Sequence, residues 1–244
     1  MIKKIVSIIP ARYQSSRFPG KPLAVILGKP MIQWVYERVS SVSEITEVYV
    51  ATDDQRIYDA VLGFGGKAIM TGECSCGSDR VYQACENLDA DIILNIQGDE
   101  PMIKTEMIRD LISAFNDPEV KMATLKKEIT SESDINNPNI AKLITDENSN
   151  AIYFSRSTIP YNRDGRDDIK YYKHIGVYGY TKDFLKTFIS LPQSSLENAE
   201  QLEQLRAIEN GYKIRVIETQ HQSIGVDLPE HIAIVEEEMK KEGL

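Results

Sequence analysis

The stretch from Ile5 to Leu23, IVSIIPARYQSSRFPGKPL, decides the fold. Its first five residues are almost all β-branched, which predicts a parallel strand buried on both faces. Pro10 has no amide hydrogen to give to a sheet ladder, so we expect the strand to end there. The loop that follows then lies at the carboxyl edge of the sheet, where α/β proteins bind their ligands.

This loop, residues 10–23, is strongly basic. It carries Arg12, Arg17 and Lys21, with hydroxyls at Ser15 and Ser16, and it contains no carboxylate. Arginine forks and lysine ammonium groups both bind phosphate well. A solvated basic loop would explain a single arginine, but three cations without an acid favour a phosphate site.

The composition argues against a nucleic-acid or membrane partner. The 244 residues hold 28 Lys and Arg against 37 Asp and Glu, a net charge of -9, and 42% are hydrophobic. Binding a polyanion needs a basic face. No apolar run approaches the roughly 18 residues of a membrane span, and the start does not read as a signal peptide. We therefore expect a soluble, cytoplasmic protein.

The three cysteines are expected to be free thiols. Cys74, Cys76 and Cys85 are an odd number in a chain without an export signal, which disfavours a disulfide framework. Cys74 and Cys76 form a C-x-C pair, but no His lies near them in the sequence to complete a zinc site.

Strand and helix patterns alternate through the first half of the chain. After the first strand we expect strands at 47–51, 68–71 and 91–97, with helices at 31–39, 57–64, 81–88 and 104–116. This rhythm is typical of a doubly wound, mostly parallel sheet with helices on both faces. It breaks at 120–182, where strand-like runs at 122–129, 141–145, 151–155 and 174–180 predict an antiparallel excursion. Helices at 183–190, 196–210 and 228–241 and a strand at 213–218 complete one domain, 1–244.

Asp99 directly follows the apolar run 91–97, at the same predicted sheet edge as the basic loop. Magnesium prefers one or two carboxylates together with phosphate oxygens, so a carboxylate beside a phosphate site is a natural ligand for it. The alternative is that Asp99 and Glu100 only cap the turn before Pro101.

Asp227 also has two interpretations. With Pro229 and Glu230 it reads as a capping box at the start of the last helix. A carboxylate has two oxygens, so capping and metal binding are compatible, and both stay open.

A second polar group lies later in the chain. Arg156 and His174 are cations in the predicted excursion and would suit an acidic co-substrate, although a lone His in a strand is more often a hydrogen-bonded core residue. Glu203 and Gln204 belong to a Glu-rich helix, and the ordinary interpretation of such residues is a solvated face.

Eight segments together resemble the 3-deoxy-manno-octulosonate (Kdo) cytidylyltransferase family. In order along nearly the whole chain they are IIPARYQSSRFPGKPL, VATDD, CGSDRV, NIQGDEP, AIYFSRSTIPY, KHIGVYGY, LEQLR and GVDLPE. The Walker A and G-x-G-x-x-G signatures of other nucleotide-binding families are absent. The resemblance implies a Rossmann-like nucleotidyltransferase fold and the reaction of CTP with Kdo, an acidic eight-carbon sugar. The products would be CMP-Kdo and diphosphate, with Mg²⁺ as cofactor, for lipopolysaccharide biosynthesis.

The resemblance also implies roles for particular residues. The catalytic set is Arg17, Lys21, Asp99 and Asp227, of which Asp99 and Asp227 hold the metal. The nucleotide contacts are Pro10, Ala11, Arg12, Ser16, Arg17, Lys21, Ser78, Arg80 and Gln97. The sugar contacts are Gln97, Arg156, His174, Tyr178, Glu203 and Gln204. A homodimer would form through the excursion, where the apolar and aromatic positions that need cover are Tyr153, Phe154, Ile159 and Tyr161.

Two features depart from the commonest family pattern. Cys76 replaces a hydroxyl residue in the glycine-containing segment, and the stretch before His174 is short compared with some members. The second departure bears on the far end of the sugar, because related enzymes act on 8-amino-Kdo. The alternatives are therefore 8-amino-Kdo or a sialic-acid-like sugar as substrate. From another class, the alternative is a non-catalytic nucleotide-binding regulator.

Overall fold

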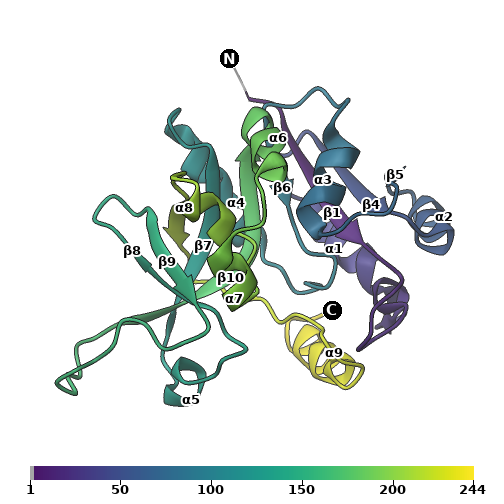
Figure 1. Ribbon diagram of the computed structural model, residues 1–244. Helices are drawn as coiled ribbons and strands as arrows, with labels where there is room; N and C mark the ends of the chain where they lie inside the picture. The colour runs from purple at the N-terminus through teal and green to yellow at the C-terminus, as the bar shows by residue number, and fades with distance from the viewer. Residues whose placement is uncertain (1–2) are drawn as a thin grey trace. The chain divides into compact units, whose positions relative to one another are not determined.

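The chain folds as a mixed α/β structure in which a mostly parallel sheet is flanked by helices and extended by antiparallel strands (Figure 1). The computed structural model describes residues 3–244. They form two compact units, one made of the residues up to Arg109 together with Gln222–Leu244, the other of Asp110–His221. The second unit is wider than the excursion predicted at 120–182, and the single domain stays a prediction.

Four parallel strands organise the first unit, in the order β6, β1, β4 and β5. This confirms the parallel half predicted from the sequence. The strands are β1 (Ile5–Ala11), β4 (Glu47–Thr52), β5 (Ala68–Met70) and β6 (Ile92–Asn95). The other elements are η1 (Lys21–Leu23), the β2 (Val25–Ile26) and β3 (Lys29–Pro30) hairpin, α1 (Met31–Ser40), α2 (Gln55–Gly63), α3 (Gly77–Cys85) and α9 (His231–Lys241), with α4 (Thr105–Ser113) at the unit boundary.

The expected end of β1 at Pro10 is wrong by one residue. Pro10 lies inside the strand, in register with Ala51 of β4, and the ladder continues to Ala11. On its other side β1 pairs with β6 only from Ile5 to Ile8. The missing amide of Pro10 is tolerated because this part of the strand needs one ladder rather than two.

The C-terminal segment closes the first unit. Val235 and Met239 of α9 pack into a buried cluster with Met31 and Trp34 of α1, and the Trp34 indole donates to the Ile26 carbonyl at 2.8 Å. Burial of large apolar side chains is the main favourable term in folding, at about 1.5–3 kcal/mol each. This packing fixes residues 222–230, and with them Asp227, on the first unit.

The capping box predicted at Asp227 is wrong. Helix α9 begins at His231, its N-cap is Glu230, and no side chain caps it. The Asp227 amide instead donates to Nδ1 of His231 at 3.2 Å, and the intervening residues form a turn. The Asp227 carboxylate therefore does not cap the helix, and the explanation of Asp227 as a purely structural residue no longer holds.

The second unit contains the antiparallel excursion. Strand β7 (Met122–Ile129) pairs with β10 (Tyr171–Thr181) in antiparallel and with β11 (Arg215–Glu218) in parallel orientation. Strands β8 (Lys142–Thr145) and β9 (Ala151–Ser155) form a hairpin that extends away from β7 in Figure 1. The remaining elements are η2 (Ala114–Asn116), α5 (Glu132–Ile135), α6 (Lys182–Ser190), α7 (Ser195–Glu200) and α8 (Leu205–Glu209).

Two expectations about this unit need correction. The single helix expected at 196–210 is two helices, α7 and α8, because Gln201 has a left-handed backbone with φ of 53° that ends the first. Phe154 is also not an uncovered aromatic, since its side chain is completely buried within the chain. On the same hairpin and the loop after it, Ile152 and Tyr161 are the exposed apolar residues, at 52% and 84%.

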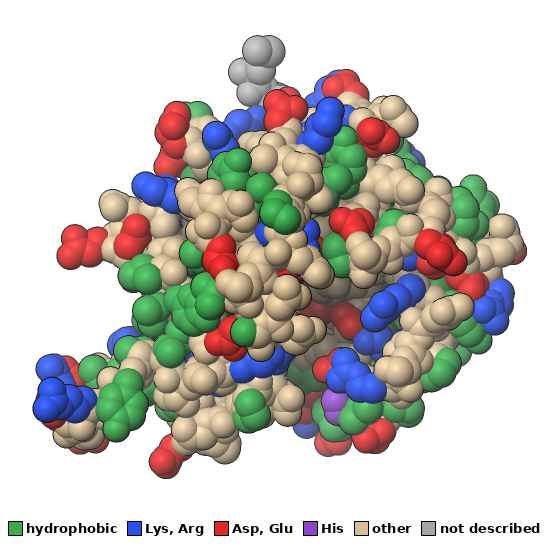
Figure 2. Space-filling model, in the orientation of Figure 1, with side chains coloured by type: hydrophobic (Ala, Val, Ile, Leu, Met, Phe, Trp, Pro, Cys, Tyr) green, Lys and Arg blue, Asp and Glu red, His purple; other side chains and the backbone are tan. Residues whose placement is uncertain are grey.

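No helix of residues 3–244 is long and apolar enough to cross a membrane. On the face shown in Figure 2, acidic and basic side chains are interspersed, and the described residues form no continuous basic surface there. Binding to a polyanion would need such a surface.

Lys142 joins the hairpin to the loop before it. The residue is fully buried, and its ammonium donates to the carbonyls of Asn137, Ile140 and Arg156 at 2.7–2.8 Å. Burial, and after it the charge of Arg156, lower the pKa of Lys142. Three carbonyl partners are what an ammonium with three N–H donors needs in a site without water.

We expect Lys142→Met to lower the free energy of unfolding by about 3 kcal/mol or more, because three buried carbonyls lose a charged donor. Urea denaturation measures the change. Lys170→Met is the matched control, since Lys170 makes only an exposed ion pair with Glu128 and should change stability by less than about 0.5 kcal/mol. Equal effects of the two substitutions would contradict this role for Lys142.

Candidate active site

A cavity of about 350 Å³ opens in the first unit, and every residue that lines it belongs to that unit. Nine residues predicted from the sequence line it: Pro10, Ala11, Arg12, Arg17, Lys21, Arg80, Gln97, Asp99 and Asp227. The structure therefore brings the basic loop, the end of β6 and the segment before α9 to one place. In the sequence, Lys21 of the first segment and Asp227 of the last are more than two hundred residues apart.

Lys21 connects these three segments. Its Nζ lies 2.5 Å from Oδ2 of Asp99 and donates to the Val226 carbonyl at 2.9 Å. The Val226 amide in turn donates to the Asp99 carbonyl at 2.9 Å. Asp227 directly follows Val226. This small network therefore fixes the backbone positions of both Asp99 and Asp227. The Lys21 side chain is only 15% exposed, which strengthens its pairing with Asp99.

Two glycines allow the backbone to take the shape of this site. Gly20 has φ of 72°, its amide donates to the Tyr13 carbonyl at 2.8 Å, and a Cβ there would lie 3.1 Å from the Tyr13 ring. A Cβ on Gly98 would lie 3.0 Å from the Pro10 carbonyl oxygen. Both positions need a residue without a side chain, because the loop folds onto Tyr13 and the turn after β6 lies against the end of β1.

Asp227 pairs with Arg17, whose Nη2 lies 3.2 Å from Oδ1. Both side chains are more than half exposed, so this pair contributes little to stability. Each carboxylate of the cavity therefore faces a cation from the basic loop. In this arrangement two positive and two negative side chains balance one another.

The two carboxylates are suited to a magnesium ion whose remaining ligands come from the substrate and water. Residues 3–244 hold no group of three or more His, Cys, Asp or Glu side chains placed to bind a metal, which argues against an all-protein cage. Magnesium commonly uses one or two carboxylates with substrate phosphates and water. Asp99 and Asp227 line the same cavity and supply that number.

Arg80 is held rigidly at the cavity wall. Its buried guanidinium donates to Oγ1 of Thr71 at 2.5 Å and to Oδ2 of Asp53 at 2.6 Å. Cys76 occupies the N-cap of α3 and makes no side-chain cap bond there, whereas a Ser or Thr hydroxyl at this position normally caps the helix. None of the three cysteines forms a disulfide, in agreement with the expected thiols.

Sequence reasoning missed part of the cavity wall and one supporting acid. The additional lining residues are Ser15, Pro22, Cys74, Ser75, Cys76, Gly77 and Gly98. Ser16 and Ser78 do not line it, and their predicted nucleotide contacts stay predictions. The adjacent hydroxyls Ser15 and Ser16 were both visible in the sequence, but only the fold of the loop selects Ser15. Asp53, the partner of Arg80, lies in the VATDD segment.

Five of the six predicted sugar residues belong to the second unit, while Gln97 belongs to the first. His174 and Tyr178 lie on β10 with their ring centroids 5.4 Å apart. Burial lowers the pKa of His174 to about 3, so the imidazole is neutral near pH 7. The shift disfavours the cationic form that the sequence suggested for His174, and its contact with the sugar stays a prediction.

Hydrogen bonds define which tautomer His174 adopts. Its Nε2 lies 2.9 Å from the Thr124 hydroxyl, and that hydroxyl donates to carbonyls of β10. The hydroxyl has one hydrogen, and the nearby carbonyls can only accept it, so we assign Nε2 of His174 as the donor to Thr124 and Nδ1 as an acceptor. Burial, and after it the charge of Glu203, raise the pKa of Tyr178, so its phenol stays protonated.

Arg156 and Gln204 are fixed around the end of α7. The Arg156 side chain donates to the carbonyls of Glu200, Pro138 and Gln201 at 2.8, 3.2 and 3.4 Å. Its guanidinium has five N–H donors, so two remain. Gln204 is 3% exposed, and its Nε2 has no hydrogen-bond partner among the described residues. A buried donor without a partner indicates a place where a ligand oxygen is expected.

His174 should make stability depend on pH. Its ordinary pKa of 6.5 in the unfolded chain lies above its folded value of about 3, so the unfolded state binds more protons between these pH values. The free energy of unfolding should therefore fall as the pH drops below about 6.5, by up to about 1.4 kcal/mol per pH unit. Denaturation of wild type and His174→Gln from pH 7 to 4 should show a shallower fall in the variant. The exposed His221→Gln should keep the wild-type slope, and a parallel fall in His174→Gln would contradict the assignment.

The first unit has the features of a nucleotide-binding α/β transferase: a parallel sheet, a cationic loop after β1 and a carboxylate after β6 on one cavity. Residues 6–214 match the family model for cytidylyltransferases. The chain belongs to the cytidylyltransferase family, and it is an enzyme of the nucleotidyltransferase type.

Close relatives carry two related names. The chain is 52% identical to the 3-deoxy-manno-octulosonate cytidylyltransferase of Syntrophus aciditrophicus, covering 96% of both chains. It is also 52% identical to the 8-amino-3,8-dideoxy-manno-octulosonate cytidylyltransferase of Shewanella piezotolerans, covering 95% of this chain and 97% of the relative.

Solved structures agree with this family. A CMP:2-keto-3-deoxy-manno-octonic acid synthetase complexed with CTP matches with a TM-score of 0.94 and 45% identity, over 98% of this chain and 99% of that chain. The 4-diphosphocytidyl-2C-methyl-D-erythritol synthase of Anaerococcus prevotii matches with a TM-score of 0.64 and 16% identity over 98% and 99%, which shows a shared fold only.

Proposed function

We propose that this chain activates Kdo by transferring the cytidylyl group of CTP to it, which gives CMP-Kdo and diphosphate for lipopolysaccharide biosynthesis. The observation that carries this proposal is the Lys21 network, because it joins the basic loop, Asp99 and the Asp227 segment at one cavity. The names of the relatives support the sugar. A second candidate substrate is 8-amino-Kdo, favoured by the relative of equal identity that bears that name.

The reaction is a substitution at the α-phosphorus of CTP. The anomeric hydroxyl oxygen of the sugar forms a bond to that phosphorus, the bond to the bridging oxygen of the β-phosphate breaks, and diphosphate leaves. The hydroxyl proton passes to solvent. Lys21 and Arg17 bind the β- and γ-phosphates and stabilise the charge that develops on them, which is the main task of a protein in phosphoryl transfer.

Asp99 and Asp227 would hold Mg²⁺. When bound, the ion neutralises phosphate charge and lowers the pKa of an oxygen that coordinates it. Two carboxylates beside a triphosphate would otherwise repel it, which is why their presence at the cavity supports a divalent ion. Lys21 and Arg17 then exchange their carboxylate partners for phosphate oxygens.

The second unit supplies groups suited to an acidic sugar. Arg156 offers positive charge and two remaining N–H donors to the carboxylate. The neutral His174 offers Nδ1 to a sugar hydroxyl, while the Tyr178 phenol and the unpartnered Gln204 amide are donors. A neutral imidazole suits hydroxyl recognition better than carboxylate recognition.

We further propose a cytoplasmic homodimer. Three free cysteines fit a reducing compartment. The exposed Ile152 and Tyr161 are candidates for the subunit contact. In a symmetric dimer the same contact would bury these two residues in each subunit.

The proposal is tested by diphosphate release with CTP, Mg²⁺ and each of Kdo, 8-amino-Kdo and sialic acid. We expect kcat/KM for Kdo to exceed that for sialic acid by on the order of 10² or more, since unpaired buried donors reject a ligand of the wrong shape. Higher kcat/KM for 8-amino-Kdo would establish the second candidate. Nucleotide binding without diphosphate release for any sugar would support a regulator and contradict the proposal.

A further inference from the structure

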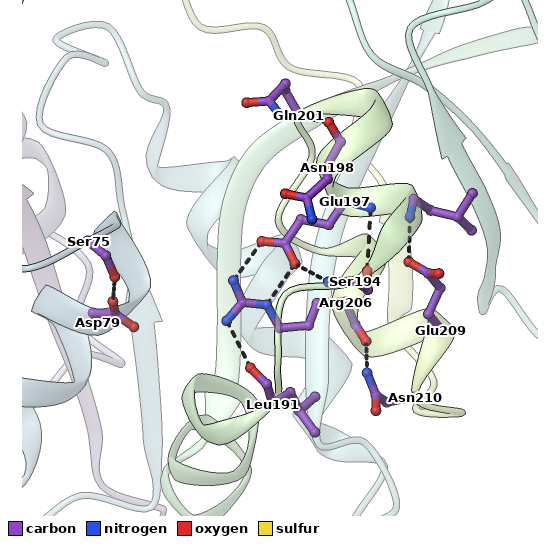
Figure 3. A network of polar contacts seen from close by, with 11 residues as sticks. Ser75, Asp79, Leu191, Ser194, Glu197, Asn198, Gln201, Arg206, Glu209 and Asn210 are labelled. Atoms are coloured by element: carbon purple, nitrogen blue, oxygen red, sulfur yellow. Dashed lines mark hydrogen bonds and ion pairs between the residues drawn. The ribbon is translucent and has the colours of Figure 1, made fainter.

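Helix α7 makes polar contacts in two directions through two carboxylates, and each direction leads to candidate sugar residues. Figure 3 shows the first, in which Glu197 faces Arg206 of α8. Glu200, one turn later, faces β9 and the start of the loop after it. Neither glutamate is among the residues that the sequence indicated as functional.

The contact between Glu197 and Arg206 is a buried, two-point ion pair. The guanidinium donates to the two carboxylate oxygens at 2.6 and 2.9 Å, and both side chains are only 8% exposed. Arg206 also donates to the Leu191 carbonyl, and Glu197 closes a capping box with Ser194 (Figure 3). The pair thus connects α8 with α7 and with Leu191, the residue that follows α6.

The ion pair spans the short link between the two helices, residues 201–204. Gln201 has a left-handed backbone, and the Leu202 amide donates to the Glu197 carbonyl at 3.3 Å. Glu203 and Gln204 end this link. Because α7 and α8 are short, the backbone hydrogen bonds of the link stabilise it only weakly. The ion pair adds to them, since it connects the helices on both sides of the link.

Glu200 fixes the position of Arg156. Its carboxylate accepts from the Arg156 amide at 2.9 Å and from the Ser155 hydroxyl at 2.6 Å, and its carbonyl accepts from Nε of Arg156 at 2.8 Å. Backbone and side chain of Arg156 are therefore both tied to one residue of α7.

We propose that Glu197 and Glu200 are positioning residues for the acidic-sugar site, an inference that rests on the proposed function. Glu197 acts through Arg206 on Glu203 and Gln204, and Glu200 acts on Arg156. A buried ion pair contributes little net stability compared with apolar residues of the same size, so orientation is the better reason for its presence. Displacement of a substrate contact by about 1 Å is enough to lower rate or affinity by up to about 10²-fold.

The test separates positioning from folding by comparing the two substrates. In Glu197→Gln, Glu200→Gln and Arg206→Lys we expect KM for Kdo to rise about 10-fold or more, while KM for CTP changes less than about 2-fold. Arg206→Lys keeps the charge but loses the two-point geometry, so it provides a folded variant if a glutamate variant is unstable. Amide hydrogen exchange at residues 201–204 should become faster in Glu197→Gln and Arg206→Lys.

Arg215→Gln is the matched control. Arg215 makes an ion pair with Asp117 at 3.0 Å in the same unit and bonds to Asn150, not to a candidate sugar residue. It should lower the melting temperature without a selective change in KM for Kdo. The inference is overturned if the Glu197, Glu200 and Arg206 variants leave KM for Kdo unchanged. It is also overturned if KM for both substrates rises together, as in a generally destabilised protein. If the wild-type chain turns over none of the acidic sugars, the proposed function falls first and this inference with it.

Discussion

One ammonium group, that of Lys21, holds the candidate active site together. It bonds to the Asp99 carboxylate and to the Val226 carbonyl, and so connects the basic loop after β1 with the end of β6 and with the C-terminal segment. Besides positioning these segments, the ion pairs of the cavity balance its charges. Lys21 and Arg17 oppose Asp99 and Asp227, so the cavity carries no large net charge from these four residues. A triphosphate with a divalent ion brings charges of both signs and can take over both sets of partners at once.

The rest of the first unit serves this arrangement. The parallel order β6, β1, β4, β5 places the ends of β1 and β6 next to each other, which is why a loop and a turn eighty residues apart meet. Gly98 has no side chain that would separate this turn from Pro10, and Gly20 allows the loop to fold onto Tyr13. The burial of Val235 and Met239 against α1 returns the chain end to the same unit, and Asp227 comes with it. The apolar cluster includes Val226, the residue before Asp227, so its packing places the second carboxylate.

Much of this was predictable because strands and loops leave local patterns. The run at residues 5–9 predicted β1, and the three cations predicted the wall of the cavity. The failures arise where a hydrogen-bond or packing partner that the sequence pattern did not indicate decides the outcome. Pro10 stays in the strand because one ladder suffices there, and Asp227 leaves its cap because His231 takes the amide. Phe154 is withdrawn from water by neighbours distant in sequence, and the ammonium of Lys142 bonds to three carbonyls that no sequence pattern indicated. The resemblance to a known family supplied the full set of sugar residues. The residue types alone suggested an acidic co-substrate for Arg156 and His174 and left Glu203 and Gln204 as a solvated face.

The central claim is that Asp99 and Asp227 act on one triphosphate through a divalent ion, and Asp227→Asn tests it most directly. The variant keeps shape and hydrogen bonding but loses the charge, and the structure leaves it no capping role. The account predicts that turnover with CTP and Kdo nearly vanishes at every Mg²⁺ concentration, while the melting temperature stays within about 2 °C of wild type. Glu230→Gln, an exposed neighbour in the same turn, should keep wild-type turnover. Wild-type turnover and Mg²⁺ dependence in Asp227→Asn would contradict the account.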